Sequence, residues 1–173
     1  RSDTNFGIEL EIKKSLAFIG LKHLSVNMNA ALINSVVKFD DQLAERNRAL
    51  QGQSPYVVNA GFYYQNDDMG LSSTLMYNVM GKRIIVAAQL NQGIVEVPDI
   101  YEMPRHVVDF SFNKKFGKQL ELKFGIKDLL VQDHITQQTF EYIKEGIQKT
   151  ATLINKRYNT GRTISLGINW TIK

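Results

Sequence analysis

Apolar and polar residues alternate along seven stretches of the chain, and this alternation is the strongest structural signal in the sequence. The last stretch is the clearest, because every apolar position from Ile164 to Ile172 is followed by a polar or small residue. A period of two places successive side chains on opposite faces of a β-strand, whereas a helix needs a period of 3.6. The stretches are 7–13, 24–32, 55–65, 70–79, 106–113, 118–127 and 163–172. The sequence therefore predicts an all-β chain of antiparallel strands.

Short and long connections take turns between these predicted strands. The short ones carry a glycine in or beside them, and the long ones are rich in polar residues. The short connections are 19–22, 66–70 and 116–119. The long connections are 39–54, 91–105 and 131–160. Up-and-down strands with tight turns at one end and long loops at the other are typical of an outer-membrane β-barrel. A soluble sandwich gives less reason for this order, because its crossovers break nearest-neighbour pairing.

Aromatic residues favour a membrane barrel over a soluble barrel with the same alternation. Those near predicted strand ends are Tyr56, Tyr64, Tyr77, Phe116, Tyr158 and Trp170. Amphipathic aromatic rings gather at the two membrane–water interfaces. In such a barrel the apolar stripes face lipid and the polar stripes face the lumen. The predicted localisation is the bacterial outer membrane, with its lipid as a partner.

Seven strands cannot close an up-and-down antiparallel barrel, which needs an even number. One solution is an eighth strand within 138–147, which would give a small complete barrel. The other is that 1–173 is the C-terminal section of a larger barrel whose earlier strands lie upstream, and the odd count favours this one. Residues 140–154 also fit helical spacing, so 131–160 is interpreted as an extracellular loop with a short helix or extended strand ends.

Composition removes several other classes of protein. The 173 residues are 43% hydrophobic and 22% charged, as in an ordinary folded domain, and no apolar run reaches the ~18–20 residues of a membrane-spanning helix. Cysteine is absent, which excludes disulfides, thiolate metal sites and a cysteine nucleophile. The net charge of +4 comes from scattered lysines and arginines, so no nucleic-acid partner is expected.

Neither catalysis nor a metal site is indicated. His23, His106 and His134 are far apart and lack metal-ligand spacing. The sequence contains no dinucleotide-binding glycine motif, no phosphate-binding loop and no nucleophile elbow. We therefore predict that the chain is not an enzyme and holds no cofactor and no metal.

Several segments, in order along nearly the whole chain, carry a family resemblance. The most specific is 48–61, which reads Arg-Ala-Leu-Gln-Gly-Gln-Ser-Pro-Tyr-Val-Val-Asn-Ala-Gly, and the others are 7–16, 77–84, 99–109 and 161–167. Together they resemble the late barrel strands of TonB-dependent outer-membrane receptors, particularly those of Bacteroidota-type bacteria. The resemblance implies part of a transporter that imports a scarce nutrient, such as an iron complex, a vitamin, a glycan or a peptide. It also implies an upstream plug domain through which the TonB complex acts.

The barrel interpretation predicts which residues face the lumen and which contact the substrate. The polar stripes, predicted to line the lumen and contact the plug, include Glu9, Glu11, Asn59, Asp109, Glu121 and Lys123. Substrate contacts are expected from the long loops, because loops carry recognition. A surface lipoprotein over these loops is a further partner that the resemblance allows.

The final strand carries a candidate signal for the barrel-assembly machinery, made of Ser165, Gly167, Trp170 and Ile172. An alternating edge strand can be captured by strand addition, with pockets that read alternate side chains. Barrels of this family commonly end on Phe, whereas this chain ends on Lys173. The simpler interpretation of the same residues is an amphipathic strand with no signalling role.

Two other functions stay open at this point. The first is a complete eight-stranded barrel with an adhesive or structural role, which requires a wall strand within 138–147 and pairing of the first and last strands. The second is a soluble β-barrel that binds a small apolar ligand, as lipocalins do, with its apolar stripes turned inward.

Overall fold

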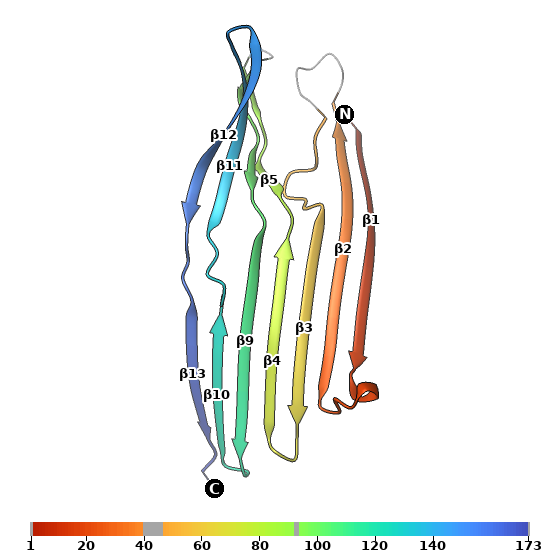
Figure 1. Ribbon diagram of the computed structural model, residues 1–173, viewed down its shortest axis with the longest axis vertical. Coiled ribbons are helices and arrows are strands. Elements are labelled where there is room, and N and C mark those ends of the chain that lie inside the picture. The colour runs from red at the N-terminus through yellow and green to blue at the C-terminus, as the bar shows by residue number, and fades with distance from the viewer. Residues whose placement is uncertain (1, 40–46, 92–93, 173) are drawn as a thin grey trace.

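The computed structural model describes residues 2–39, 47–91 and 94–172. Its main feature is a seven-stranded antiparallel sheet in the order β1-β2-β3-β4-β9-β10-β13 (Figure 1). These strands are β1 Ser2–Ser15, β2 Leu24–Lys38, β3 Tyr56–Asn66, β4 Leu71–Met80, β9 Arg105–Phe116, β10 Leu120–Lys127 and β13 Thr163–Trp170. The prediction of an antiparallel all-β wall is confirmed. The sheet is not closed, because β1 and β13 form its two edges.

A second set of strands extends this wall at the end where the long connections lie (Figure 1). A four-stranded sheet in the order β12-β11-β8-β5 and a two-stranded sheet of β6 and β7 make up this set. The strands are β5 Arg83–Val86, β6 Gln89–Asn91, β7 Ile94–Val97, β8 Ile100–Glu102, β11 His134–Lys144 and β12 Ile147–Tyr158. We call β11 and β12 the upper hairpin.

The upper hairpin decides between the two forms expected within 131–160, a short helix and extended strands. The helix suggested by the spacing in 140–154 is wrong, because these residues form two paired strands. Glu145 and Gly146 have φ angles of 56° and 74°, as required of both central residues in the two-residue turn that best matches strand twist. A strand does cover 138–144, but it belongs to the second sheet and does not supply an eighth strand of the wall.

Three tight connections lie at the opposite end of the wall, which we call the short-turn end. One holds the 3-10 helix η1 (Ala17–Ile19), and the other two are the turns between β3 and β4 and between β9 and β10. The last two use glycines with positive φ, Gly70 at 59° and Gly117 at 61°. The predicted alternation of short and long connections is therefore present. Among the described residues, no helix is long and apolar enough to cross a membrane.

Segment 48–55 explains part of the most specific sequence motif. It bridges β2 and β5, because Leu50 N donates to Ser35 Oγ (3.1 Å) and Gly52 N donates to Ile84 O (2.7 Å). The hydroxyl of Ser54, which is 3% exposed, donates to the backbone oxygen of Tyr56 at 2.7 Å. These bonds tie the segment to β2, to β5 and to the first residue of β3, so it fixes where β3 begins.

Candidate functional site

Strand register gives the wall two chemically different faces. Phe110 pairs with Leu75 on one side and Ile126 on the other, and this row continues to Phe62 and Ile164. We call the face that carries this row the apolar face. The other face carries rows such as Glu11, Asn29, Asn59 and Asn78, and we call it the polar face. A one-residue slip would exchange the two faces, so the alternation seen in the sequence sets the register.

No second layer formed by residues 2–39, 47–91 or 94–172 covers the apolar face. Ile8 is 62% exposed and Leu166 is 76% exposed on the edge strands, and even in the interior strands Phe62 and Leu75 are 46% and 41% exposed. Soluble monomers rarely expose contiguous apolar patches this extensive. In the described part of the chain, only Val37, Val79 and Ile84 are buried hydrophobic residues. This is not the packed interior of a soluble barrel or sandwich.

On the polar face, hydrogen bonds join neighbouring strands. Asn29 donates to Glu9 at 2.6 Å, Asn78 donates to Asn59 at 2.5 Å, and Asn169 donates to Glu121 at 3.0 Å. The predicted lumen-facing residues Glu9, Glu11, Asn59, Asp109, Glu121 and Lys123 all lie on this one face. Their role in lining a lumen stays a prediction. The arrangement suits a hydrated surface, because its amides and carboxylates find partners across the strands.

A glycine and a tyrosine interlock on the polar face, which the sequence pattern did not single out. The ring of Tyr63 lies over Gly61, so an added Cβ at position 61 would meet Tyr63 Cε2 and Oη at 2.7 Å. The Tyr63 hydroxyl also reaches Met76 Sδ, at 3.6 Å, on the next strand. The spacing Gly-x-Tyr within a strand is the signal that could have identified this contact.

Histidines pair with tyrosines near the strand ends. His106 stacks on Tyr77 with ring centres 5.9 Å apart, and the Tyr77 hydroxyl is 2.7 Å from His106 Nδ1. The rings of His134 and Tyr158 stack at 4.7 Å, and His23 meets Tyr64 edge to face at 5.9 Å. The structure thus gives each histidine an aromatic partner. Nowhere in the described ranges do three or more potential metal-ligating side chains gather.

The long connections contact one another through charged groups. Arg48 and Asp99 form an ion pair at 3.8 Å, and Asp99 also accepts a hydrogen bond from Ala88 N at 2.7 Å. Burial, and next the nearby Asp99 carboxylate, raise the pKa of Tyr101 above its ordinary value. The predicted substrate loops 39–54 and 91–105 also include 40–46 and 92–93, which lie outside the described residues.

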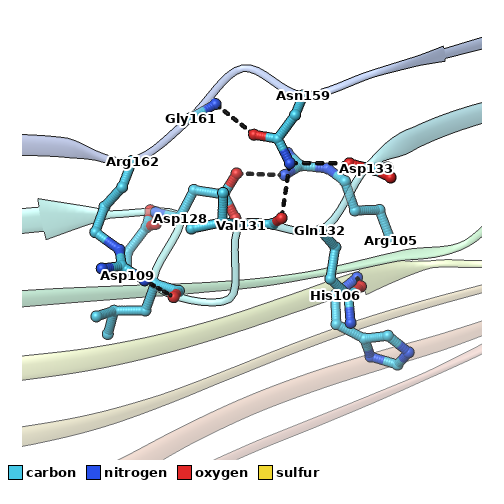
Figure 2. A network of polar contacts seen from close by, with 11 residues as sticks. Arg105, His106, Asp109, Asp128, Val131, Gln132, Asp133, Asn159, Gly161 and Arg162 are labelled. Atoms are coloured by element: carbon cyan, nitrogen blue, oxygen red, sulfur yellow. Dashed lines mark hydrogen bonds and ion pairs between the residues drawn. The ribbon is translucent and has the colours of Figure 1, made fainter.

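A polar network joins the upper hairpin to the wall (Figure 2). At its centre Asp128, which is 8% exposed and has a φ of 57°, pairs with Arg105 at 2.7 Å. The backbone N–H of Asp128 donates to the carboxylate of Asp109 at 2.8 Å. The predicted polar-face residue Asp109 therefore has a structural role, since it binds the backbone N–H of the residue that follows β10. No pattern in the sequence marks Asp128, because its partners are 19 and 23 residues away.

Asn159 is the second organiser of this network (Figure 2). Its amide nitrogen donates to Val131 O at 2.7 Å and to Asp133 Oδ1 at 3.0 Å, and its oxygen accepts from Gly161 N at 2.7 Å. Arg162 completes the attachment by donating to Leu129 O at 2.7 Å. The connection that leads into the hairpin, 128–133, is thus hydrogen-bonded to the connection that leads out of it, 159–162.

Acidification is expected to loosen this attachment. The hydrogen bond from Asn159, and next that from Arg157, lower the pKa of Asp133 below its ordinary value of 3.8. Because the folded state favours the carboxylate, the stabilisation is complete above the ordinary value and is lost as the pH falls through the lowered one. Hydrogen exchange of the 128–133 and 159–162 amides, corrected for intrinsic rates, should show faster opening only at the acid end. The variant Asp133→Asn should show a smaller acid-dependent step, and a step of unchanged size would contradict the assignment.

Three of the four candidate assembly residues, Ser165, Gly167 and Trp170, lie on the free edge strand β13. Ser165 and Gly167 belong to the polar face and pair with Gly125 and Lys123 on β10. Trp170 is 73% exposed on the apolar face, and Ile172, 88% exposed, follows the end of the strand. The edge is therefore accessible for pairing with another strand, while the signalling role stays a prediction.

Neither a known protein family nor a curated protein sequence matches the chain. Among solved structures, the chain is similar to the crystal structure of the ferric yersiniabactin uptake receptor FyuA from Yersinia pestis, with a TM-score of 0.64 and 17% sequence identity. The match covers 97% of this chain and 23% of the FyuA chain. The chain therefore spans less than a quarter of that receptor, and at this identity the likeness concerns the fold. The fold is an antiparallel all-β wall similar to a section of that structure.

Proposed function

We propose that the chain is the C-terminal section of the barrel of a TonB-dependent transporter in the bacterial outer membrane. The observation that carries this proposal is an open antiparallel wall whose apolar face has exposed side chains on both edge and interior strands and whose polar face is hydrogen-bonded from strand to strand. A wall of this kind suits a site between membrane lipid on one side and a hydrated lumen on the other. The similarity to part of an uptake receptor supports the same reading.

In this proposal the two edges of the sheet continue into upstream strands of the same barrel. β1 and β13 do not pair with each other, and unpaired edges are a liability that barrels remove by closure. The polar face then borders the lumen, where it contacts an upstream plug domain. The TonB complex acts through that plug, and the long loops at the far end contact the imported nutrient.

The Bacteroidota type of transporter rests on the sequence motifs alone, as does a surface lipoprotein over the loops. FyuA comes from Yersinia pestis and adds nothing to either. The nutrient itself is proposed only as a class: an iron complex, a vitamin, a glycan or a peptide. The whole transporter, of which the chain is proposed to be one section, would import it without chemical conversion and without a resident cofactor.

The two rival functions have less support. A complete eight-stranded barrel would need β1 and β13 to pair and a wall strand within 138–147, and the described chain has neither. A soluble ligand-binding barrel would need its apolar stripes packed against one another in an interior. The exposure of Phe62 and Leu75 in the middle of the wall argues against that arrangement.

The proposal is tested by the intact mass of the native polypeptide isolated from outer membranes. A polypeptide several times heavier than 19.7 kDa, recovered in the outer-membrane fraction, is expected. A mass near 19.7 kDa in that fraction would contradict the transporter and favour a small closed barrel. Absence from the membrane fraction would contradict both and favour the soluble fold.

Loss of the last aromatic and apolar side chains is expected to block assembly. Replacing Trp170 and Ile172 together by Ser should leave little protein in the outer membrane, because strand capture reads alternate side chains of an edge strand. Comparison of outer-membrane and periplasmic fractions by immunoblot measures the effect, and Trp170→Phe serves as the control that keeps an aromatic ring. Full assembly of the double variant would contradict a signalling role for these residues.

A further inference from the structure

The alternation of apolar and polar residues does not by itself fix how β2 pairs with β3. A slip of one residue exchanges the two faces of a strand, but a slip of two residues returns every side chain to its own face. A short turn selects one register, as it does between β3 and β4. β2 and β3 are joined instead by the long connection from Lys38 to Tyr56, which has the length to absorb such a slip. This strand pair therefore needs another source of register.

The side chains along the pair would accept a slip of two residues. On the apolar face Met28 lies opposite Ala60, and after the slip it would lie opposite Val58, again apolar against apolar. Ser25 and His23 reach across the pair to backbone oxygens of β3, which recur at every second residue on one edge of a strand. The contacts within the wall thus discriminate little between the two registers.

Segment 48–55 lies between β2 and β5, above the start of β3 (Figure 1), and is bonded to both strands. On the β2 side, the backbones of Arg48 and Val37 exchange two hydrogen bonds, at 2.8 and 3.2 Å. On the β5 side, Gln51 Nε2 donates to Ile85 O at 2.8 Å. The segment therefore holds β2 and β5 at one height relative to each other.

The contact of this segment with Ser35 is specific for one register. Leu50 N donates to the hydroxyl of Ser35. A slip of two residues would bring Leu50 opposite Ile33 or Val37, whose side chains carry no hydrogen-bond acceptor. The slipped chain would therefore lose this bond, although its apolar and polar faces would be unchanged.

Packing around Gly81 gives a second register-specific contact. Gly81 N donates to Tyr56 O at 2.9 Å, and a Cβ at position 81 would meet Tyr56 Cε1 at 2.8 Å and Ser54 Oγ at 3.0 Å. Only a residue without a side chain allows the segment to approach so closely. Val37 and Ile84, which are buried, lie on the two strands that the segment joins. Sliding would disrupt this packing, whereas the exposed faces of the wall offer no such resistance.

We propose that segment 48–55 is a register lock, which selects one of the pairings of β2 with β3 that the alternation allows. The inference goes beyond the proposed function and does not depend on what the barrel transports. It gives a role to the motif 48–61, which the transport proposal leaves without one. Because strand stagger, tilt and diameter are linked in a closed barrel, the lock would also set the width of the lumen.

Disulfides between introduced cysteines distinguish the registers in the full-length protein. The pair A30C/V58C joins residues that are partners in the native register. The pairs A30C/A60C and M28C/V58C join residues that become partners only after a slip of two, one pair for each direction. Diagonal neighbours in a sheet are about 7–8 Å apart, which is beyond the reach of a disulfide. Mass spectrometry of the oxidised and digested protein measures the fraction of each link.

The lock is weakened by S35A/S54A, which removes both hydroxyls that hold the segment. The matched control S25A/S73A removes two hydroxyls that bond to backbone oxygens within the wall. Each buried group left without a partner shifts an equilibrium by about tenfold, so the ratio of slipped to native links should rise on the order of a hundredfold in S35A/S54A. The control should match the wild type.

Hydrogen exchange of the Gly52 and Gly81 amides shows whether the segment has come loose in each variant. Native links alone in a variant whose segment is loose would overturn the lock, as would slipped links that are equally frequent in the control. A segment that stays closed in S35A/S54A would overturn the contacts on which the lock rests. Where S35A/S54A does not assemble, S54A is judged by the same links. They are measured in whichever cell fraction holds the protein, so a failure of the proposed function leaves this test intact.

Discussion

Arginine in place of Phe110 is expected to cost the folded wall about 2–4 kcal/mol and to remove most of the protein from the membrane fraction. Phe110 lies in the middle of β9, with Leu75 and Ile126 beside it on the apolar face. If this face meets lipid, the variant places a guanidinium in hydrocarbon with no carboxylate in reach. Urea titration of the detergent-solubilised protein measures the loss of stability, and fractionation measures the loss of assembly.

The matched control is Ser111→Arg, one residue further along the same strand. Ser111 lies on the polar face, where it pairs with Thr74 and Gly125. An arginine there projects to the hydrated side, so it should change stability by less than about 0.5 kcal/mol. Equal damage from both variants would contradict the assignment of the two faces.

Replacement of Arg105 by Leu is expected to destabilise the base of the upper hairpin by about 2–3 kcal/mol. Asp128 is 8% exposed, so its carboxylate would be left buried without its ion-pair partner. Removing one partner of a buried pair costs about 3–5 kcal/mol, and the lower figure applies because Arg105 is itself about a fifth exposed. The effect should appear as faster hydrogen exchange in 128–133, with β1 to β3 unchanged.

The second change Asp128→Asn should recover part of this loss, because it removes the uncompensated charge. In the double variant R105L/D128N, exchange in 128–133 is expected to slow again relative to R105L alone. A double variant that is less protected than R105L would show that Arg105 acts through packing and not through the charge of Asp128.

The wall itself could be predicted from the sequence because its cause is local. Each alternating stretch, such as 163–172, has one apolar and one polar side, and the short turns carry glycine where positive φ is needed. The same reasoning grouped Glu9 and Asn59 on one face, since a period of two leaves no other option.

The sequence left a short helix and extended strands both open for the upper hairpin, and the reason is physical. In 140–154 the apolar residues are spaced at three or four positions, because the hairpin exposes both faces and no buried side enforces alternation. The turn residues Glu145 and Gly146 were the local signal that could have favoured a hairpin over a helix. The Arg105–Asp128 pair is non-local, and only the folded chain brings these residues together.

The most direct test of the central claim is the accessibility of single cysteines along β9, from 108 to 112, in the full-length protein reconstituted in lipid. The chain has no cysteine of its own, so each introduced thiol can be spin-labelled without background from this section. The account predicts that labels at 108, 110 and 112 collide with oxygen dissolved in lipid, while those at 109 and 111 collide with a water-soluble nickel complex. Labels at 108, 110 and 112 that neither reagent reaches would mean a packed interior, and would contradict a lipid-facing wall.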